Sequence, residues 1–225
     1  MASLEPFVPE YWCASCRTPF LNSAPLDSAG LCPLCRDGLR AFEGAYSFGA
    51  YEGGLRRLIH MLKYEGVRPL ARPLAEMAVR ALPKDLVFDA VTPVPMHWRR
   101  RWSRGFNQSE LIAREVARTL RVPVLKATKR TRFTPPQAEL TISARRRNAE
   151  GSFRAVRGAV VKEKRVLLID DVLTTGATAG ACAAVIKRAG ARSVTVLTVA
   201  RADRRIGLAM LRGLGRGKNS VGAVQ

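Results

Sequence analysis

The stretch VLLIDDVLTTGAT, residues 166–178, decides the fold of this chain. It begins with a run of apolar residues that is typical of a central strand buried on both faces. The strand ends in two acids, Asp170 and Asp171, and a turn then leads directly into a helix. Because ligands of open α/β sheets bind beyond the carboxyl ends of the strands, we expect a binding site at this turn.

The turn after this strand carries the groups that a sugar phosphate requires. Gly176 allows the backbone to approach a ligand closely, and the N–H groups of the turn and of the helix N-terminus form a cradle for an anion. The two carboxylates can accept hydrogen bonds from ribose hydroxyls and help to hold Mg²⁺. The predicted phosphate loop comprises Thr174, Thr175, Gly176, Ala177 and Thr178.

Strands and helices alternate from Ala45 onward. The expected strands span residues 45–51, 88–95, 122–128, 165–171 and 192–202. The expected helices span residues 53–64, 69–82, 109–120 and 176–190, and Asn107 is expected to cap the third. Such alternation with apolar strands predicts an α/β fold whose parallel sheet is covered on both faces. Residues 129–150 have weak periodicity, and we expect a long loop there with at most one helical turn.

Four of the five cysteines form two CxxC pairs separated by fifteen residues: Cys13, Cys16, Cys32 and Cys35. Two such pairs complete a tetrahedral Zn²⁺ site with Zn–S distances of about 2.3 Å. All four positions are filled by protein ligands, which indicates a structural zinc site, not a catalytic one. A disulfide or a redox pair is the alternative. The remaining cysteine, Cys182, is expected to be buried in a helix.

The charge balance is the unusual feature of the composition. The chain of 225 residues has 38 Lys and Arg against 18 Asp and Glu, a formal net charge of +20. This excess favours phosphate groups, nucleic acid or an anionic membrane surface as partners, and an unspecialised basic surface is the alternative. The hydrophobic content of 47% excludes a disordered chain. No apolar run reaches the roughly 18–20 residues of a membrane span, and the N-terminus lacks the features of a secretory signal, so we expect a cytoplasmic protein with reduced thiols.

Aromatic residues are interleaved with the basic ones. The clusters consist of Trp98 and Trp102 with Arg99, Arg100, Arg101 and Arg104, of Phe133 with Lys129, Arg130 and Arg132, and of Arg145, Arg146 and Arg147. Positive charge follows a phosphodiester backbone, and aromatic rings stack on bases with a free energy of about 1–3 kcal/mol per base. These clusters favour single-stranded DNA as a partner. The alternative is that the arginines hold a diphosphate or form a solvated rim.

The thirteen-residue stretch resembles the phosphoribosyl pyrophosphate (PRPP) binding motif of type I phosphoribosyltransferases. Three further blocks and the four-cysteine segment resemble the ComF family of competence-associated, phosphoribosyltransferase-like proteins: PVPMHWRRRWSRGFNQSEL (93–111), LKYEGVRPLARPLAE (62–76) and TPPQAELTISARRRNAEGSF (134–153). The resemblance covers residues 12–201. It leaves the basic tail unexplained, and Met96 stands where leucine is usual in the family.

The resemblance implies a type I phosphoribosyltransferase fold at residues 45–204, preceded by a zinc-binding module at 1–44. The tail at 205–225 is rich in Gly, Arg and Lys, and we expect it to be mobile. The resemblance implies that Asp170 and Asp171 contact the ribose of PRPP, that the phosphate loop holds its 5′-phosphate, and that residues 131–148 close over the sugar. The implied pyrophosphate loop, with Mg²⁺, comprises Val94, Pro95, Met96 and His97.

Two functions of different class remain open. The chain is either a DNA-uptake protein that binds PRPP and single-stranded DNA, or a phosphoribosyltransferase with an unidentified nucleobase or amine acceptor. Other proteins of the uptake machinery are further expected partners, and an accessory role in sugar-acid uptake is a third alternative. No catalytic residue is assigned. His97 is as compatible with assistance at the pyrophosphate as with a structural or surface role. His60 lies near the apolar face of its helix, and we expect it to be packed, not catalytic.

Overall fold

The computed structural model describes residues 9–23, 25–38, 40–98, 102, 104–131 and 151–202. The strands are β1 (Tyr11–Trp12), β2 (Pro19–Phe20), β3 (Gly44–Ala50), β4 (Ala90–Pro93), β5 (Thr128–Arg130), β6 (Phe153–Ala155), β7 (Arg165–Leu173) and β8 (Ser193–Arg201). The helices are α1 (Pro33–Arg36), α2 (Gly53–Tyr64), the 3-10 helix η1 (Arg68–Leu70), α3 (Ala71–Val79), α5 (Gln108–Leu120) and α7 (Ala177–Arg188). The predicted tail at 205–225 and most of the predicted loop at 131–148 lie outside the described residues.

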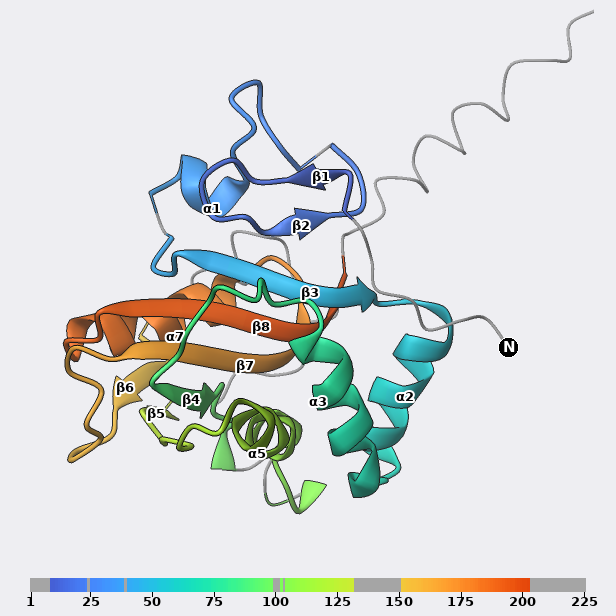
Figure 1. The fold of residues 1–225 in the computed structure, drawn as a ribbon, viewed down its shortest axis with the longest axis vertical. Helices are drawn as coiled ribbons and strands as arrows, with labels where there is room; N and C mark the ends of the chain where they lie inside the picture. The colour runs from blue at the N-terminus through green and yellow to red at the C-terminus, as the bar shows by residue number, and fades with distance from the viewer. Residues whose placement is uncertain are drawn as a thin grey trace, which may run out of the picture.

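The centre of the molecule is a parallel sheet with strand order β3-β8-β7-β4 (Figure 1). The two central strands, β7 and β8, are nine residues long and pair in parallel, with Leu167 opposite Thr195 and Ile169 opposite Leu197. Successive side chains of a strand point to opposite faces, so Leu167 and Leu168 enter different hydrophobic clusters. The parallel sheet predicted from the apolar strands is therefore confirmed.

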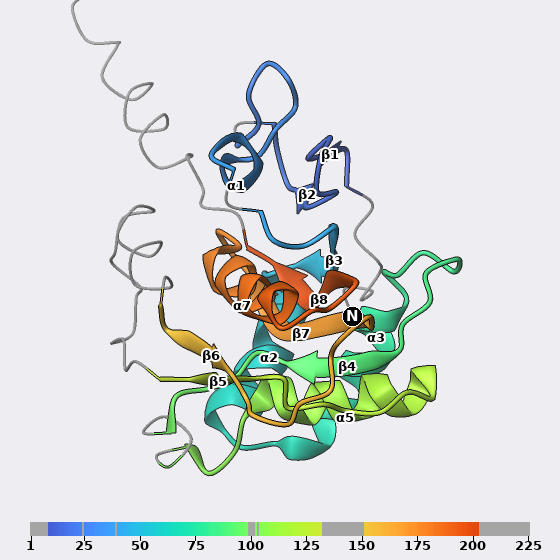
Figure 2. The same ribbon diagram turned by 90° about the vertical axis from the view of Figure 1, so that its left-hand side faces the viewer.

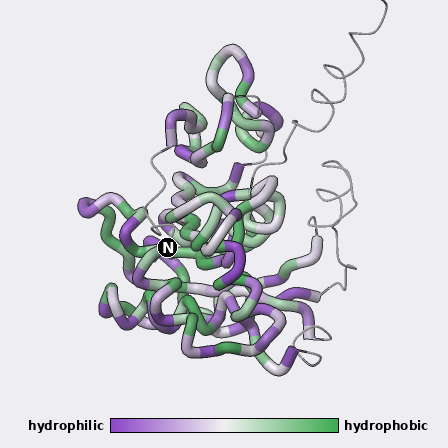
Figure 3. The backbone as a smooth tube through the Cα atoms, turned by 90° about the vertical axis from the view of Figure 1, so that its right-hand side faces the viewer, coloured by the Kyte–Doolittle hydropathy of each residue, from purple (hydrophilic) through white to green (hydrophobic). Residues whose placement is uncertain are grey.

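Helices cover both faces of this sheet (Figure 2). Leu62 of α2, Leu74 of α3 and Ile112 of α5 pack with Leu167 on one face. Ile186 of α7 packs with Leu168 on the other. Figure 3 shows hydrophobic and hydrophilic residues interspersed along the backbone. Cys182 is fully buried in α7, as predicted.

Local sequence signals fixed several element bounds correctly. The helix predicted at 53–64 is α2, and the side-chain oxygen of Asn107 accepts a hydrogen bond from the Ser109 N–H at 3.1 Å, as an N-cap does. The helix predicted at 69–82 is shorter than expected. It begins as the 3-10 turn η1, and its α-helical part, α3, ends at Val79. Pro83 disfavours the helical conformation in the residue before it, which limits the extension of α3.

The predicted strand at 122–128 is wrong. This segment makes only an isolated bridge between Val91 and Val124, and the next strand, β5, starts at Thr128. The Val91 N–H donates to the Pro123 carbonyl at 2.9 Å, but Pro123 has no N–H of its own. The Ala127 N–H donates to the Thr92 hydroxyl at 3.3 Å, so it forms no hydrogen bond with the backbone of a neighbouring strand. The prediction of a long loop at 129–150 is incomplete, because its first residues belong to β5, which pairs antiparallel with β6.

The four-cysteine module, predicted at 1–44, lies beside β3, the edge strand of the sheet (Figure 1). Its elements are the short β1–β2 hairpin and α1. The Ala45 N–H of β3 donates to the Cys16 carbonyl at 3.0 Å, so the module covers an exposed strand edge. Phe20 and Cys16 belong to the same hydrophobic cluster as α7. The module therefore packs on the sheet domain, and the boundary between them at residue 44 stays a prediction.

No helix within the described ranges has both the length and the apolar character needed to cross a membrane.

Candidate functional site

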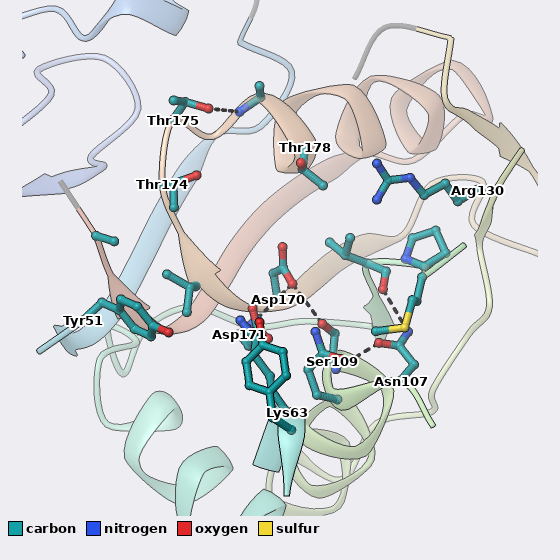
Figure 4. A pocket seen from close by; sticks show the side chains of 18 residues that line it. Tyr51, Lys63, Asn107, Ser109, Arg130, Asp170, Asp171, Thr174, Thr175 and Thr178 are labelled. Carbon is teal, nitrogen blue, oxygen red and sulfur yellow. Dashed lines mark hydrogen bonds and ion pairs between the residues drawn. The ribbon is translucent and has the colours of Figure 1, made fainter. Parts of the chain in front are cut away.

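A cavity of about 490 Å³ opens at the carboxyl ends of β4 and β7 (Figure 4). The predicted site residues that line it are Val94, Pro95, Met96, Asp170, Asp171, Thr174, Thr175, Ala177 and Thr178. Gly176 lies within the same loop but is not part of the lining, and His97 is buried against Trp98 with the ring centroids 5.6 Å apart. The structure thus brings both predicted loops and the acid pair to one cavity.

The first acid, Asp170, is held by the N-terminus of α5. Its Oδ1 accepts a hydrogen bond from the Ser109 hydroxyl at 2.9 Å and another from the Asp171 backbone N–H at 3.0 Å. Desolvation and the neighbouring Asp171 carboxylate raise the pKa of Asp170 to about 7, while the hydrogen bond from Ser109 opposes this rise. A ligand that donates hydrogen bonds to Asp170 or brings positive charge near it would therefore favour the ionised form of its carboxyl group.

The second acid, Asp171, is paired with a lysine that the sequence analysis did not single out. Lys63, at the end of α2, places its Nζ 2.8 Å from Oδ2 of Asp171, and both side chains are largely buried. Burial alone would lower the pKa of Lys63, but the Asp171 carboxylate outweighs this and raises it, so the lysine stays protonated. The only sequence signal for Lys63 was its place in the block at 62–76. That block resembles the ComF family, but it predicted no function for the lysine.

The start of α5 also fixes the end of β4. The Asn107 side-chain N–H donates to the Val94 carbonyl at 3.1 Å, while its oxygen caps the helix. Asn107 was predicted only as a cap, yet it lines the cavity together with Gln108 and Ser109. One side chain thus holds the predicted pyrophosphate loop against the helix that holds Asp170.

The predicted phosphate loop leads directly into the N-terminus of α7. Gly176 precedes α7 with φ of +75°, a left-handed conformation that favours glycine. The first N–H groups of a helix have no partner within the helix, so α7 offers them toward the loop. Thr175 turns its hydroxyl toward the Ala177 N–H at 3.4 Å (Figure 4). The arrangement suits a phosphate group.

Basic and aromatic side chains line the rest of the cavity. Arg130 of β5 lies on the wall, with its guanidinium 5.5 Å from the Phe153 ring centroid. Tyr51 and Tyr64 also line the cavity, and the guanidinium of Arg104 lies 5.1 Å from the Tyr64 ring. Of the basic residues singled out in the sequence, Arg130 therefore lies in the cavity and Arg104 beside it. Arg99, Arg100, Arg101, Arg132, Arg145, Arg146 and Arg147 lie outside the described residues.

The four cysteines of the module form a second candidate site. The ligand atoms of Cys13, Cys16, Cys32 and Cys35 lie within 4.8 Å of one another. The Cys16 and Cys32 sulfurs are 3.7 Å apart, against about 3.8 Å for the edge of a tetrahedron with Zn–S bonds of about 2.3 Å. The hydrogen bond between Cys16 and Cys32 lowers the pKa of Cys16 and raises that of Cys32, and burial raises the pKa of Cys35. The five cysteines are free in the structure, and the four of the cluster fit a structural zinc ion.

Comparison with known proteins places the chain in a family. A family model for the phosphoribosyl transferase domain matches residues 107–212. Competence protein F of Haemophilus influenzae is 33% identical over 162 residues, which cover 68% of this chain and 71% of that protein. The chain belongs to the ComF family. DNA utilization protein YhgH of Escherichia coli O157:H7 is 34% identical over 158 residues, covering 67% of this chain and 69% of that protein.

Membership of the ComF family confirms the resemblance stated from the sequence and, with the parallel sheet, the type I phosphoribosyltransferase fold. Orotate phosphoribosyltransferase from Aeropyrum pernix is a structural neighbour at 17% identity and a TM-score of 0.38, with 72% of this chain and 82% of that chain covered. A likeness of this size adds no argument, so the fold assignment rests on the family match and the sheet.

Proposed function

We propose that this ComF-family chain works in DNA uptake, binds PRPP with Mg²⁺ in the cavity and binds single-stranded DNA on the adjoining basic surface. The observation that carries the PRPP part is the meeting of an acid pair, a phosphate loop and a second backbone loop in one cavity. Its relatives include a protein named for competence and others named for DNA utilization, which supports the uptake role.

Each part of PRPP has a chemical counterpart in the cavity. The ribose hydroxyls donate to Asp170 and Asp171, and the 5′-phosphate accepts from the N–H groups of residues 174–178. The diphosphate lies toward the end of β4, where Arg130 supplies positive charge and Mg²⁺ neutralises the rest. The Nζ of Lys63 lies 2.8 Å from Oδ2 of Asp171 and so fixes the position of the carboxylate that accepts from the ribose.

Calorimetry with PRPP and Mg²⁺ tests this site on three proteins. Wild type binds, whereas the Asp170→Ala/Asp171→Ala variant loses two hydrogen bonds to charged groups and binds about a hundredfold more weakly or not at all. The matched control is Asp85→Ala/Glu76→Ala, which removes two exposed acids outside the cavity and leaves binding unchanged. Absence of PRPP binding in folded, zinc-loaded wild type overturns the proposal.

The single-stranded DNA part is supported by two exposed tryptophans next to the cavity. Trp98 and Trp102 are 56% and 81% exposed, with ring centroids 6.4 Å apart. Trp98 lies five residues beyond the end of β4 at Pro93, and Arg104 lies two residues beyond Trp102 in the sequence. Exposed rings beside positive charge offer a stacking surface for bases along a phosphate backbone.

Fluorescence anisotropy with a labelled oligodeoxythymidine tests this surface. The Trp98→Ala/Trp102→Ala variant binds more weakly by about 1–3 kcal/mol per lost stack. Trp12→Ala is the matched control, since Trp12 is also an exposed tryptophan, 51% exposed, but belongs to the module. Binding that depends on phosphate contacts weakens steeply as salt rises. A flat salt dependence, or equal losses for Trp12→Ala, contradicts the assignment.

The alternative function is transfer of the phosphoribosyl group to a nucleobase or an amine. The aromatic rings of Tyr51 and Tyr64 in the cavity lining favour it, because they offer stacking surfaces to a base. Release of pyrophosphate from PRPP in the presence of candidate acceptors would establish turnover. We propose the cytoplasm as the location, because a four-cysteine metal site requires reduced thiols, and other uptake proteins as partners.

A further inference from the structure

The second CxxC turn of the module reaches the phosphate loop of the cavity. A Cβ atom built on Gly176 would lie 2.6 Å from Cδ1 of Leu34, and the next nearest atom, Cδ1 of Leu173, would be 3.9 Å away. Leu34 stands between the metal-site cysteines Cys32 and Cys35. The module therefore occupies the space into which a side chain at Gly176 would project.

The position of Leu34 depends on the cysteine cluster. It lies on α1, a helix of only four residues, none fully buried, and α1 packs through Leu34 and Cys35 at the rim of the cluster that contains the cysteine sulfurs. The Cys32 N–H is directed at Cys13 Sγ at 3.3 Å, and the Cys35 and Arg36 N–H groups both donate to the Cys32 carbonyl at 2.9 Å. The sulfurs and the turns around them thus define where Leu34 points.

A second contact joins the module to the beginning of the same loop. The guanidinium of Arg201 lies 4.4 Å from the ring centroid of Phe20, and both residues are buried. Arg201 of β8 is in register with Leu173, the last residue of β7 before the phosphate loop. The Ala202 N–H donates to the Leu173 carbonyl at 2.9 Å. The module therefore contacts the loop region at Gly176 and also, through Arg201, where the loop leaves the sheet.

We propose that the four-cysteine module braces the phosphate loop, with Leu34 as the positioning residue, so that metal occupancy of the module controls anion binding 140 residues further along the chain. A cradle of backbone N–H groups binds an anion only when the groups converge, and a glycine at its centre leaves the backbone free to leave that geometry. Leu34 restricts this freedom. The part of the inference that concerns ligand binding rests on the proposed function, because PRPP is the anion whose affinity is measured.

Hydrogen exchange tests the brace without any ligand. The amides of residues 174–178 are followed in zinc-loaded wild type, in wild type treated with a chelator, in Leu34→Ala and in Leu26→Ala. Leu26 is the matched control, because it is a half-buried leucine of the same module that is not among the nearest neighbours of Gly176. We expect faster exchange at 174–178 after chelation and in Leu34→Ala, and wild-type exchange in Leu26→Ala. Unchanged exchange in Leu34→Ala with zinc bound overturns the brace.

Calorimetry with PRPP and Mg²⁺ on the same proteins measures how the loss of the brace changes the affinity for PRPP. If the loop is competent in a tenth of Leu34→Ala molecules, the affinity falls about tenfold, while one zinc per chain is retained. Leu34→Met, which keeps the side-chain volume, restores the affinity. Gly176→Ala binds more weakly than wild type, and Leu34→Ala costs less affinity in the Gly176→Ala background than in wild type, because the introduced methyl group no longer meets Leu34.

The outcomes separate the two proposals. If wild type does not bind PRPP but Leu34→Ala exchanges faster at 174–178, the proposed function fails and the brace stands. If wild type binds PRPP and Leu34→Ala matches it in exchange and affinity, the brace fails and the proposed function stands. If Leu34→Ala loses its zinc, the chelated wild type decides the question, and unchanged exchange at residues 174–178 after chelation overturns the brace.

Discussion

The sheet domain and the four-cysteine module are built on opposite principles. In the sheet domain, every residue of β7 from Val166 to Ile169 is buried, and the two hydrophobic clusters meet on either side of it. In the module, the strands have two residues each and α1 buries none. The domain is stabilised by many small contributions, whereas the module depends on four sulfur atoms and its contact with the domain. The difference determines which perturbation unfolds each part.

Metal removal gives the largest expected effect and breaks the module first. Structural zinc contributes an apparent free energy of about 10–16 kcal/mol to folding of such sites. We expect Cys16→Ser to lose its zinc and to change the fluorescence of Trp12 in β1, while the sheet domain keeps its circular dichroism. Zinc content is measured by atomic emission. Cys182→Ser is the control cysteine outside the cluster, and retention of zinc by Cys16→Ser contradicts the assignment.

A core truncation tests the other side of the comparison. Leu168 is fully buried in the cluster shared by α7 and the module. We expect Leu168→Ala to lower the free energy of unfolding by about 2–5 kcal/mol, measured by urea denaturation with zinc present. Leu21→Ala, at a leucine that is 37% exposed, stays within about 0.5 kcal/mol of wild type. Equal losses in the two variants would show that the core does not carry the stability of the domain.

The acid pair sharpens the comparison, because here the domain carries a group that opposes its own stability. The pKa of Asp170 is raised to about 7, above its ordinary value of 3.8. The folded chain therefore binds the proton more tightly than the unfolded chain, and stability is lost as the pH rises from 3.8 toward 7. Asp170→Asn keeps an acceptor for Ser109 but cannot ionise. We expect its melting temperature, relative to wild type, to rise with pH between 5 and about 7 and to level off above.

Ionisation of Asp170 should have the opposite effect on ligand binding: it lowers stability as the pH rises, but it should increase the affinity for PRPP. Ribose hydroxyls donate to the ionised carboxylate, so protonation of Asp170 competes with PRPP. We expect the affinity of wild type for PRPP to increase between pH 6 and 8 more steeply than that of Asp170→Asn, as measured by calorimetry. The titration of PRPP itself contributes equally to both proteins. Identical slopes in the two proteins would mean that Asp170 does not sense the ligand.

What could be predicted from the sequence was local. The bounds of α2 and the cap at Asn107 follow from residues that are neighbours in the chain. The motif at 166–178 brought its acids and its loop to one place because both belong to a single strand–turn–helix unit.

What was missed depends on contacts between distant segments. The β5–β6 hairpin joins strands separated by more than twenty residues, and the Lys63–Asp171 pair requires α2 to pack beside β7. Neither leaves a periodic signal in the sequence. The same holds for Leu34, which is far from Gly176 in the sequence and comes close to it only in the folded chain.

The smallest expected effect on stability comes from Asn107, where one side chain serves both the helix and the cavity. Serine caps helices about as well as asparagine, so Asn107→Ser should change the free energy of unfolding by only a few tenths of a kcal/mol. Serine is too short to cap Ser109 and also donate to the Val94 carbonyl, a bond of 3.1 Å in the structure. We therefore expect weaker PRPP binding at nearly unchanged stability, whereas Asn107→Ala loses both, with about 1 kcal/mol of stability. If Asn107→Ser binds PRPP like wild type, the end of β4 is held by its own strand and not by α5.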